Sequence, residues 1–135
     1  ITKINSLDFL SNSIKTTYPP GMEVIIYKGN LLVEVNKVIE KNNPLREHVS
    51  MHLYNNKNLR VLNLEAPKHY LYPEIYLEVD TDVDFELVKI IFEYFINKKK
   101  FDFTLSDILN FLNKNKSLIE INKSVNRRWK KYRIN

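Results

Sequence analysis

With 135 residues, the chain is long enough for one domain or for part of a larger one. Its content of 44% hydrophobic and 12% aromatic residues allows a buried core and excludes a disordered polymer. Cysteine is absent, and no apolar run approaches the roughly 18 residues that a membrane span requires, so disulfides, thiolate metal sites and a transmembrane helix are excluded and a cytoplasmic location is expected.

The net charge of +5 is unevenly distributed. Residues 96–135 contain 11 Lys and Arg against 3 Asp and Glu, whereas the preceding residues contain 10 against 13. Such a basic tail can contact nucleic acid or a phosphate-rich partner, or it can simply be a solvated helical segment. Because no nucleic-acid-binding motif accompanies the charge, we expect no nucleic-acid partner.

Glycine is scarce, with Gly21 and Gly29 alone. A glycine-rich phosphate loop needs several such positions, so a nucleotide-phosphate cradle is not encoded here. The chain also begins with Ile1 rather than Met, which leads us to expect a processed product or a piece of a longer protein.

The hydrophobic pattern predicts alternating strands and helices followed by a helical tail. Turn signals such as Pro19-Pro20-Gly21 and Asn42-Asn43-Pro44 separate the first elements. In chain order we expect strands at 7–10 and 22–27, helices at 31–41 and 45–54, strands at 59–64 and 75–80, and helices at 81–97, 105–113 and 118–129.

Capping signals support the last three helices. Thr81 with Asp84, Thr104 with Asp107, and Ser117 with Glu120 each place an acidic residue three positions after a hydroxyl residue. In the helix after Thr81, helical spacing puts one apolar face on a set of four residues: Val88, Ile91, Phe92 and Phe95.

The expected strand at 75–80 ends in an acidic cluster directly before a helix. Because side chains alternate along a strand, Glu78 and Asp80 point to the same face. Two carboxylates at a strand end can hold Mg²⁺, which combines a few carboxylates with phosphates and water. Asp80 can equally be a helix cap, and the positions of Asp82 and Asp84 favour capping.

A second cluster is Arg46-Glu47-His48, with His52 one helical turn after His48. Two histidines at this spacing can be metal ligands on one helical face, but no HExxH motif is formed and no third ligand is evident. The alternative is a structural role, in which Arg46 and His48 bind a phosphate, a carboxylate or a neighbouring loop.

Four ordered segments resemble the cytidylyltransferase family of sugar-activating enzymes, in its spore-coat polysaccharide biosynthesis branch, which is similar to the synthetases of CMP-sialic acid and CMP-Kdo. The resemblance runs from about Leu7 to Val125 and rests on YPPGMEV (18–24), REHV (46–49), NLEAP (63–67) and VDTDVDFEL (79–87).

The resemblance implies an α/β fold, namely the C-terminal half of a Rossmann-like nucleotidyltransferase domain in residues 1–97, with a basic helical tail in residues 98–135. It implies the reaction of CTP with a sugar acid or related sugar to give a CMP-sugar and pyrophosphate, with Mg²⁺ as cofactor and a homodimer as the assembly. It also implies Asp80 first and Glu78 second as metal ligands, and Arg46, His48 and Glu23 as substrate-binding residues.

The chain departs from the family pattern in ways that limit this expectation. The N-terminal half, with the CTP loop and the first metal-binding Asp, has no counterpart, so the chain alone is not expected to catalyse. Ile25 replaces a second acidic residue of the family, Asp82-Val83 stands where Pro-Glu is usual, and Ser50-Met51 replaces Thr-Pro. The alternative hypothesis is a non-catalytic dimerisation or assembly module.

Overall fold

The chain divides into two compact units, each with its own hydrophobic core. The computed structural model describes residues 6–48, 50–127 and 129–130. Unit 1 consists of Ile1–Lys15, Glu23–Glu65 and Trp129–Asn135, and unit 2 of Thr16–Met22 and Ala66–Arg128. None of the described helices is long and apolar enough to cross a bilayer.

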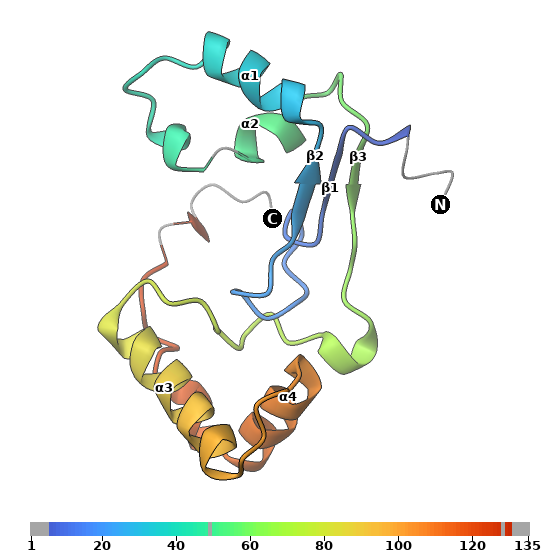
Figure 1. Cartoon of the computed structure of the whole chain (residues 1–135). Helices are drawn as coiled ribbons and strands as arrows, with labels where there is room; N and C mark the ends of the chain where they lie inside the picture. The colour runs from blue at the N-terminus through green and yellow to red at the C-terminus, as the bar shows by residue number, and fades with distance from the viewer. Residues whose placement is uncertain (1–5, 49, 128, 131–135) are drawn as a thin grey trace. The chain divides into compact units, whose positions relative to one another are not determined.

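Unit 1 is built on a three-stranded sheet with the order β2-β1-β3. The central strand β1 (Phe9–Ser11) pairs antiparallel with β2 (Ile25–Tyr27) and parallel with β3 (Val61–Asn63), as Figure 1 shows. Because β2 runs antiparallel to β1 and β3, the helical segment that follows β2 joins the two edge strands at one end of the sheet and crosses over β1.

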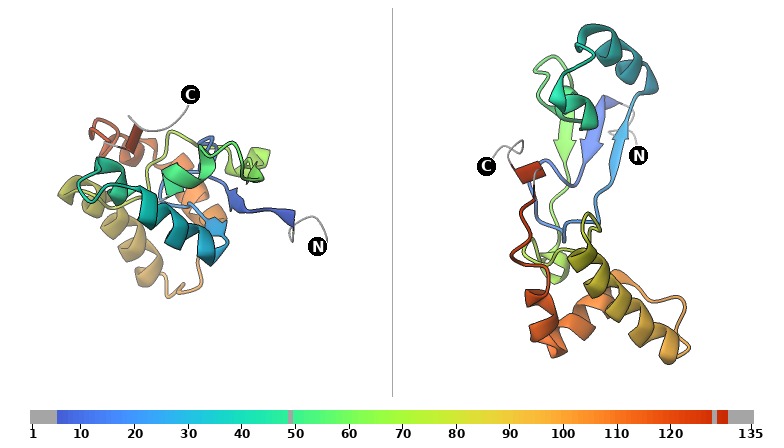
Figure 2. Two further views of the ribbon diagram at one scale, coloured as in Figure 1. Left: turned by 90° about the horizontal axis from the view of Figure 1, so that it is seen from above. Right: turned by 90° about the vertical axis from the view of Figure 1, so that its left-hand side faces the viewer.

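The crossover consists of α1 (Gly29–Val38), a 3₁₀ turn (Pro44–Glu47) and α2 (Ser50–Tyr54). Both α-helices lie at the end of the sheet where β2 leads into α1 (Figure 2). The core of unit 1 is formed by the buried side chains of Phe9, Leu31 and Leu53.

Unit 2 contains α3 (Asp82–Asn97) and α4 (Leu105–Lys114), which form a V in Figure 1. Their core consists of Ile75, Leu77, Leu87, Ile91, Phe95, Leu109, Phe111 and Leu112. Aromatic rings join the two helices, since Tyr94 of α3 stacks on Phe111 of α4 with ring centroids 4.0 Å apart. Two short 3₁₀ helices, Lys68–Tyr70 and Lys116–Glu120, complete the unit.

The mixed α/β fold class is confirmed, and most expected elements are present with shorter bounds. The capping boxes at Thr81 and Thr104 are confirmed: each threonine hydroxyl accepts the backbone N–H of the aspartate, and each aspartate carboxylate accepts the backbone N–H of the threonine. The expected helix over 45–54 is instead divided into the 3₁₀ turn and α2. The boundary expected between the α/β part (1–97) and the basic helical tail (98–135) stays a prediction.

The strand expected at 75–80 is wrong, because no described strand pairs with this extended segment. Its backbone N–H groups are used elsewhere: Leu77 donates to the Pro20 carbonyl at 2.7 Å, and Asp80 donates to the Asp84 carboxylate at 3.3 Å. The periodicity of the sequence correctly indicates extended backbone, but a strand also requires a partner.

The α-helix expected at 118–129 is wrong in the described residues, which form a 3₁₀ turn at Lys116–Glu120 and are 3₁₀ again at Trp129, while residue 128 lies outside the described part. The chain leaves helical geometry because Asn122 and Arg127 turn inward to hydrogen-bond Asp84. The buried face of α3 also differs from expectation, since Leu87 is buried whereas Phe92 is 48% exposed.

Gly21 holds the loop before β2 against the extended segment, and its substitution tests this contact. Its φ is +103°, and a Cβ would lie 2.4 Å from the Glu78 nitrogen and 2.5 Å from the Leu77 carbonyl carbon. We therefore expect Gly21→Ala to lower the free energy of unfolding by at least about 2 kcal/mol in chemical denaturation.

Gly29→Ala is the matched control for that substitution. A Cβ at Gly29 would meet no atom within 4 Å, and the residue lies at the start of α1. Its free energy of unfolding should stay within about 1 kcal/mol of the original protein or rise. Equal losses in the two variants would contradict the proposed contact at Gly21.

Candidate functional site

The candidate site is the acidic turn, defined here as residues 78–84, which joins the extended segment to α3. Ile75 and Leu77 anchor the segment in the core of unit 2, each less than a tenth exposed. The chain then reaches the surface, because Glu78 is half-buried and Asp80 is exposed. The fold therefore presents the carboxylate of Asp80 to solvent at the beginning of a helix.

A capping box fixes the shape of this turn. The Thr81 hydroxyl accepts the Asp84 N–H at 3.3 Å, while Asp84 Oδ2 accepts the Thr81 N–H at 3.0 Å and the Thr81 hydroxyl at 2.8 Å. The negative charge of Asp84 also suits the positive end of the α3 dipole. The capping role expected for Asp84 is confirmed.

Asp84 has a second role that the sequence does not indicate. Its other oxygen, Oδ1, accepts hydrogen bonds from Asn122 at 2.8 Å and from Arg127 at 2.7 Å. The same guanidinium lies 2.9 Å from Glu78 Oε1 and 4.2 Å above the ring of Tyr76. One buried arginine thus bridges two carboxylates of the acidic turn, and its side chain is only 1% exposed.

The ion pair determines the protonation of Asp84. Burial would raise the pKa of this carboxyl, but the hydrogen bonds from Arg127, Thr81 and Asn122 outweigh burial and lower the pKa to about 2. Asp84 is therefore ionised at neutral pH, with its charge compensated inside unit 2.

Arg127 and Asn122 are absent from the candidates that sequence analysis produces. They belong to the basic tail, where the excess of Lys and Arg suggests solvated charge. Their contacts join residues 43 and 38 positions apart, so no local spacing reveals them.

Asp80 and Glu78 differ in their fitness as metal ligands. The exposed carboxylate of Asp80 is accessible to a cation, whereas Glu78 is paired with Arg127. Among the described residues, no group of three or more His, Asp or Glu side chains could hold a metal ion. The assignment of Asp80 and Glu78 as metal ligands stays a prediction.

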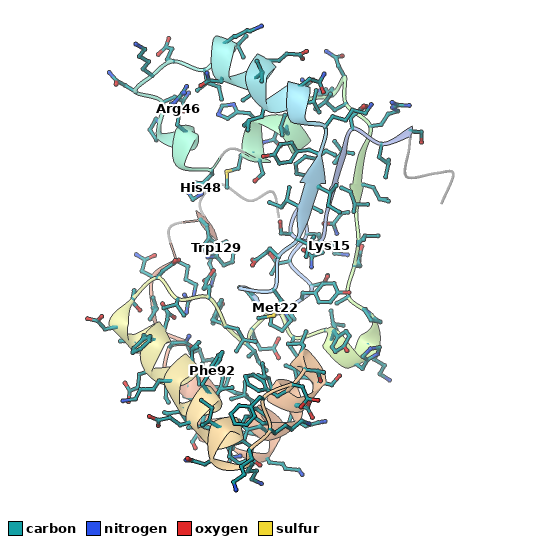
Figure 3. The ribbon with its side chains drawn as sticks, in the orientation of Figure 1. Lys15, Met22, Arg46, His48, Phe92 and Trp129 are labelled. Carbon is teal, nitrogen blue, oxygen red and sulfur yellow. The ribbon has the colours of Figure 1, made fainter. Side chains whose placement is uncertain are left out.

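The expected substrate-binding residues Arg46, His48 and Glu23 all belong to unit 1. Figure 3 shows Arg46 and His48 on the segment between α1 and α2. His48 precedes α2 rather than lying on it, so the expected i, i+4 pair with His52 does not share one helical face. Glu23 lies before β2 and is half-buried.

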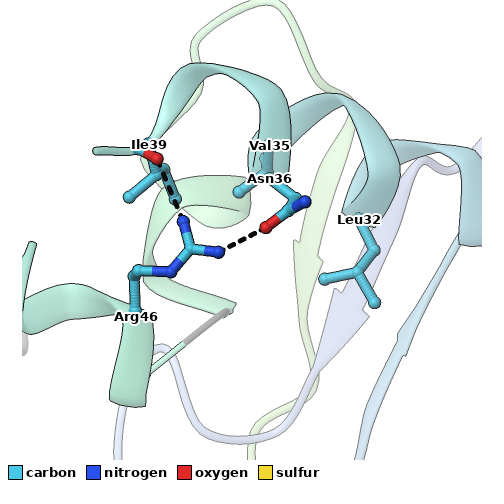
Figure 4. Close-up of a pocket in the computed structure, with 5 residues that line it drawn as sticks. All are labelled: Leu32, Val35, Asn36, Ile39 and Arg46. Carbon is cyan, nitrogen blue, oxygen red and sulfur yellow. Dashed lines mark hydrogen bonds between the residues drawn. The ribbon is translucent and has the colours of Figure 1, made fainter. Parts of the chain in front are cut away.

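Arg46 has a clear structural function. Its guanidinium donates to the Ile39 carbonyl at 3.0 Å, just beyond the end of α1, and to the side chain of Asn36 (Figure 4). These two residues, with Leu32, Val35 and Arg46 itself, line a hollow of about 60 Å³. The structural alternative for Arg46 is thus supported, and its expected role in substrate binding stays a prediction.

Comparisons with known proteins give two relatives by sequence and one by structure, while no family model matches the chain. The spore coat polysaccharide biosynthesis protein SpsF of Bacillus subtilis is 29% identical over 98 residues, covering 72% of this chain and 40% of that protein. An uncharacterised protein of Methanocaldococcus jannaschii is 39% identical over 92 residues, covering 65% of this chain and 35% of that protein.

A cytidylyltransferase from Leptospira borgpetersenii is similar in structure, with a TM-score of 0.70 and 26% identity, covering 90% of this chain and 49% of the other. In its mixed α/β fold the chain is thus similar to part of a cytidylyltransferase structure. By sequence the chain is similar to a spore coat polysaccharide biosynthesis protein, and by structure it is similar to a cytidylyltransferase. It spans less than half the length of each of these three relatives.

The depressed pKa of Asp84 predicts a loss of stability in acid. A carboxyl whose pKa lies at about 2 when folded and near 3.8 when unfolded contributes its full stabilisation above about pH 5. That contribution, about 2 kcal/mol, disappears as the pH falls from about 4 towards 2. Denaturation curves at pH 7, 5 and 3 measure this dependence.

Asp84→Asn should flatten this acid dependence and lower the free energy of unfolding at pH 7 by several kcal/mol, because it leaves Arg127 buried with one partner fewer. Asp102→Asn, at an exposed position between α3 and α4, is the matched control. An Asp84→Asn variant with the same stability and acid dependence as the control would refute the role assigned to the ion pair.

Proposed function

We propose that this chain is part of a cytidylyltransferase that joins CTP and a sugar to give a CMP-sugar and pyrophosphate in polysaccharide biosynthesis. The observation that carries the proposal is the match of 90% of the chain to a cytidylyltransferase structure with a TM-score of 0.70. The relationship to a spore coat polysaccharide biosynthesis protein supports the biosynthetic context.

In this proposal the acidic turn supplies one carboxylate to the metal site. Asp80 would hold Mg²⁺, and the bound ion would neutralise phosphate charge while the sugar hydroxyl attacks the α-phosphate. The chain's own residues prepare this position: the capping box orients the turn, and the core residues Ile75 and Leu77 fix the segment that leads to it.

The sugar is expected to be acidic or closely related, because of the resemblance to the synthetases of CMP-sialic acid and CMP-Kdo. Arg46 and His48 are the proposed contacts for an anionic group, and Glu23 is the proposed contact for a hydroxyl. A homodimer and a cytoplasmic location belong to the same proposal. They rest on the family relationship, and a partner surface is not assigned to either unit.

The proposal predicts a strict requirement for Asp80 in a longer protein that contains this chain. Asp80→Asn should reduce Mg²⁺-dependent pyrophosphate release from CTP and a panel of sugar acids by about a hundredfold or more, since a metal-bound carboxylate contributes several kcal/mol to phosphate chemistry.

Asp82→Asn, an exposed carboxylate in the first turn of α3, is the matched control and should retain activity within a few fold. Circular dichroism should show that both variants keep the fold. Turnover by Asp80→Asn equal to that of the control would exclude Asp80 as a required ligand. No pyrophosphate release from any sugar by the original protein would refute the proposed reaction.

A further inference from the structure

A hollow of about 310 Å³ lies within unit 2, between residues at the end of α3 and residues of α4. Basic, amide and hydroxyl groups line it, together with aromatic rings. The polar members of the lining are Tyr94, Lys98, Lys100, Asp107, Asn110 and Lys114. Its lysines belong to the basic excess of residues 96–135, for which a phosphate-rich partner and a solvated segment are the open alternatives.

Stacked aromatic rings hold the two sides of this hollow together. Tyr94 of α3 and Phe111 of α4 stack with their ring centroids 4.0 Å apart. The ammonium group of Lys98 lies 4.5 Å from the centroid of the Tyr94 ring, where a cation–π attraction keeps it beside the hollow. Lys114 follows Phe111 by one helical turn, so it lies on the same side of α4. The ring stack thus brings both lysines to one hollow.

The charges that line the hollow do not cancel. Lys100 donates to Asp107 Oδ1 at 2.6 Å, and Asp107 Oδ2 accepts the Thr104 backbone N–H at 2.8 Å. Both carboxylate oxygens are therefore occupied, and Lys100 compensates the charge of Asp107. Lys98 and Lys114 have no carboxylate partner in the part of the chain that the structure describes. Three lysines and one aspartate leave a charge of +2 in the lining.

The polar groups that stay available in the hollow are hydrogen-bond donors. Lysine can only donate, and the Asn110 amide and the Tyr94 hydroxyl can donate as well. A matching ligand carries acceptor oxygens and a charge near −2, and a phosphate monoester has three such oxygens and a charge of about −1.5 to −2 at neutral pH. Pockets for small ligands begin at about 300 Å³, so the organic part of such a molecule can be accommodated too.

We propose that this hollow binds a small phosphorylated molecule through its phosphate group, with Lys98 and Lys114 as the charged contacts and Asn110 as a neutral donor. Lys100 has a different task, because its pairing with Asp107 keeps that carboxylate from repelling the ligand. The inference goes beyond the proposed reaction, since the site uses none of the residues assigned to that reaction. It gives the lysines at the end of α3 a ligand rather than solvent alone.

Glucose 6-phosphate and inorganic phosphate are the probes, with glucose as the uncharged comparison. We would titrate each into the ¹⁵N-labelled chain and follow the amides of residues 94–100 and 107–114. Ionic strength is kept constant because salt screens exposed charges. We expect saturable shifts in both segments with the two phosphates and none with glucose, and glucose 6-phosphate should bind at least as tightly as inorganic phosphate.

Lys98→Gln and Lys114→Gln should each weaken phosphate binding by about threefold to fivefold, as expected for the loss of one exposed charge pair. The double variant should lose the saturable shifts. Lys89→Gln is the matched control, because Lys89 is an exposed lysine of α3 that pairs with Glu93 and does not line the hollow. Its dissociation constant should stay within about twofold of the original.

A lysine near the end of α3 also suits the negative end of the helix dipole, but that role changes stability and not ligand affinity. Chemical denaturation of each variant separates the two effects. Equal weakening by Lys89→Gln and Lys98→Gln, shifts outside the two segments only, weaker binding of glucose 6-phosphate than of inorganic phosphate, or no saturable shift would each overturn the inference. The assay involves no turnover, so its failure leaves the proposed reaction standing, and an inactive parent protein leaves this site standing.

Discussion

A single buried guanidinium joins three parts of unit 2. Arg127 brings a positive charge into the interior, which is tolerable only because Asp84 and Glu78 meet it within 3 Å. Asp84 in turn caps α3, and α3 contributes Leu87, Ile91 and Phe95 to the core. The ion pair therefore connects the start of the long helix, the acidic turn and the tail in one network.

Unit 1 contains a comparable cluster of ion pairs at its surface. Asp8 accepts bonds from Arg60, 52 residues away, and from Lys28, which precedes α1. These cations hold the pKa of Asp8 well below its usual range, with Arg60 as the larger cause. Arg60 and Lys28 are about half exposed, so solvent screens their attraction to Asp8. These surface ion pairs therefore stabilise the fold less than the buried pair of Arg127 and Asp84 does. Both clusters are ion pairs of an aspartate with basic side chains, but one is buried and the other is exposed to solvent.

Local sequence signals predict local structure well in this chain. Thr81 and Thr104 each sit three residues before an aspartate, and both capping boxes are formed because their hydrogen bonds close within one turn. The same signal fails at Ser117, where tertiary hydrogen bonds from Asn122 draw the chain away from helical geometry. Local propensity is overridden where a buried polar side chain must reach a distant partner.

Local sequence signals also fail to reveal the tertiary contacts of the candidate site. Alternation correctly places Asp80 after an extended segment, but it treats Glu78 as equivalent to Asp80, since both lie on one face of an ideal strand. What separates them is Arg127, a residue of the tail that ordinary charge counting assigns to solvent. Resemblance to a family does not resolve this difference either, because a family motif describes the turn and not the side chains that pack behind it.

Under the proposed function, Asp80 is the accessible carboxylate of the acidic turn, because Glu78 and Asp84 are paired with Arg127. A site with one accessible carboxylate binds a bare divalent cation weakly, because water competes for the remaining positions. The same carboxylate adds favourably to a cation that already carries phosphate oxygens, where charge is partly neutralised and fewer waters need to leave. In the proposed enzyme, the ion pairs of Glu78 and Asp84 with Arg127 would keep the charge of the turn low and so favour a metal–phosphate complex over the free ion. Such a preference would suit the proposed nucleotidyl transfer, in which the metal acts together with the nucleotide.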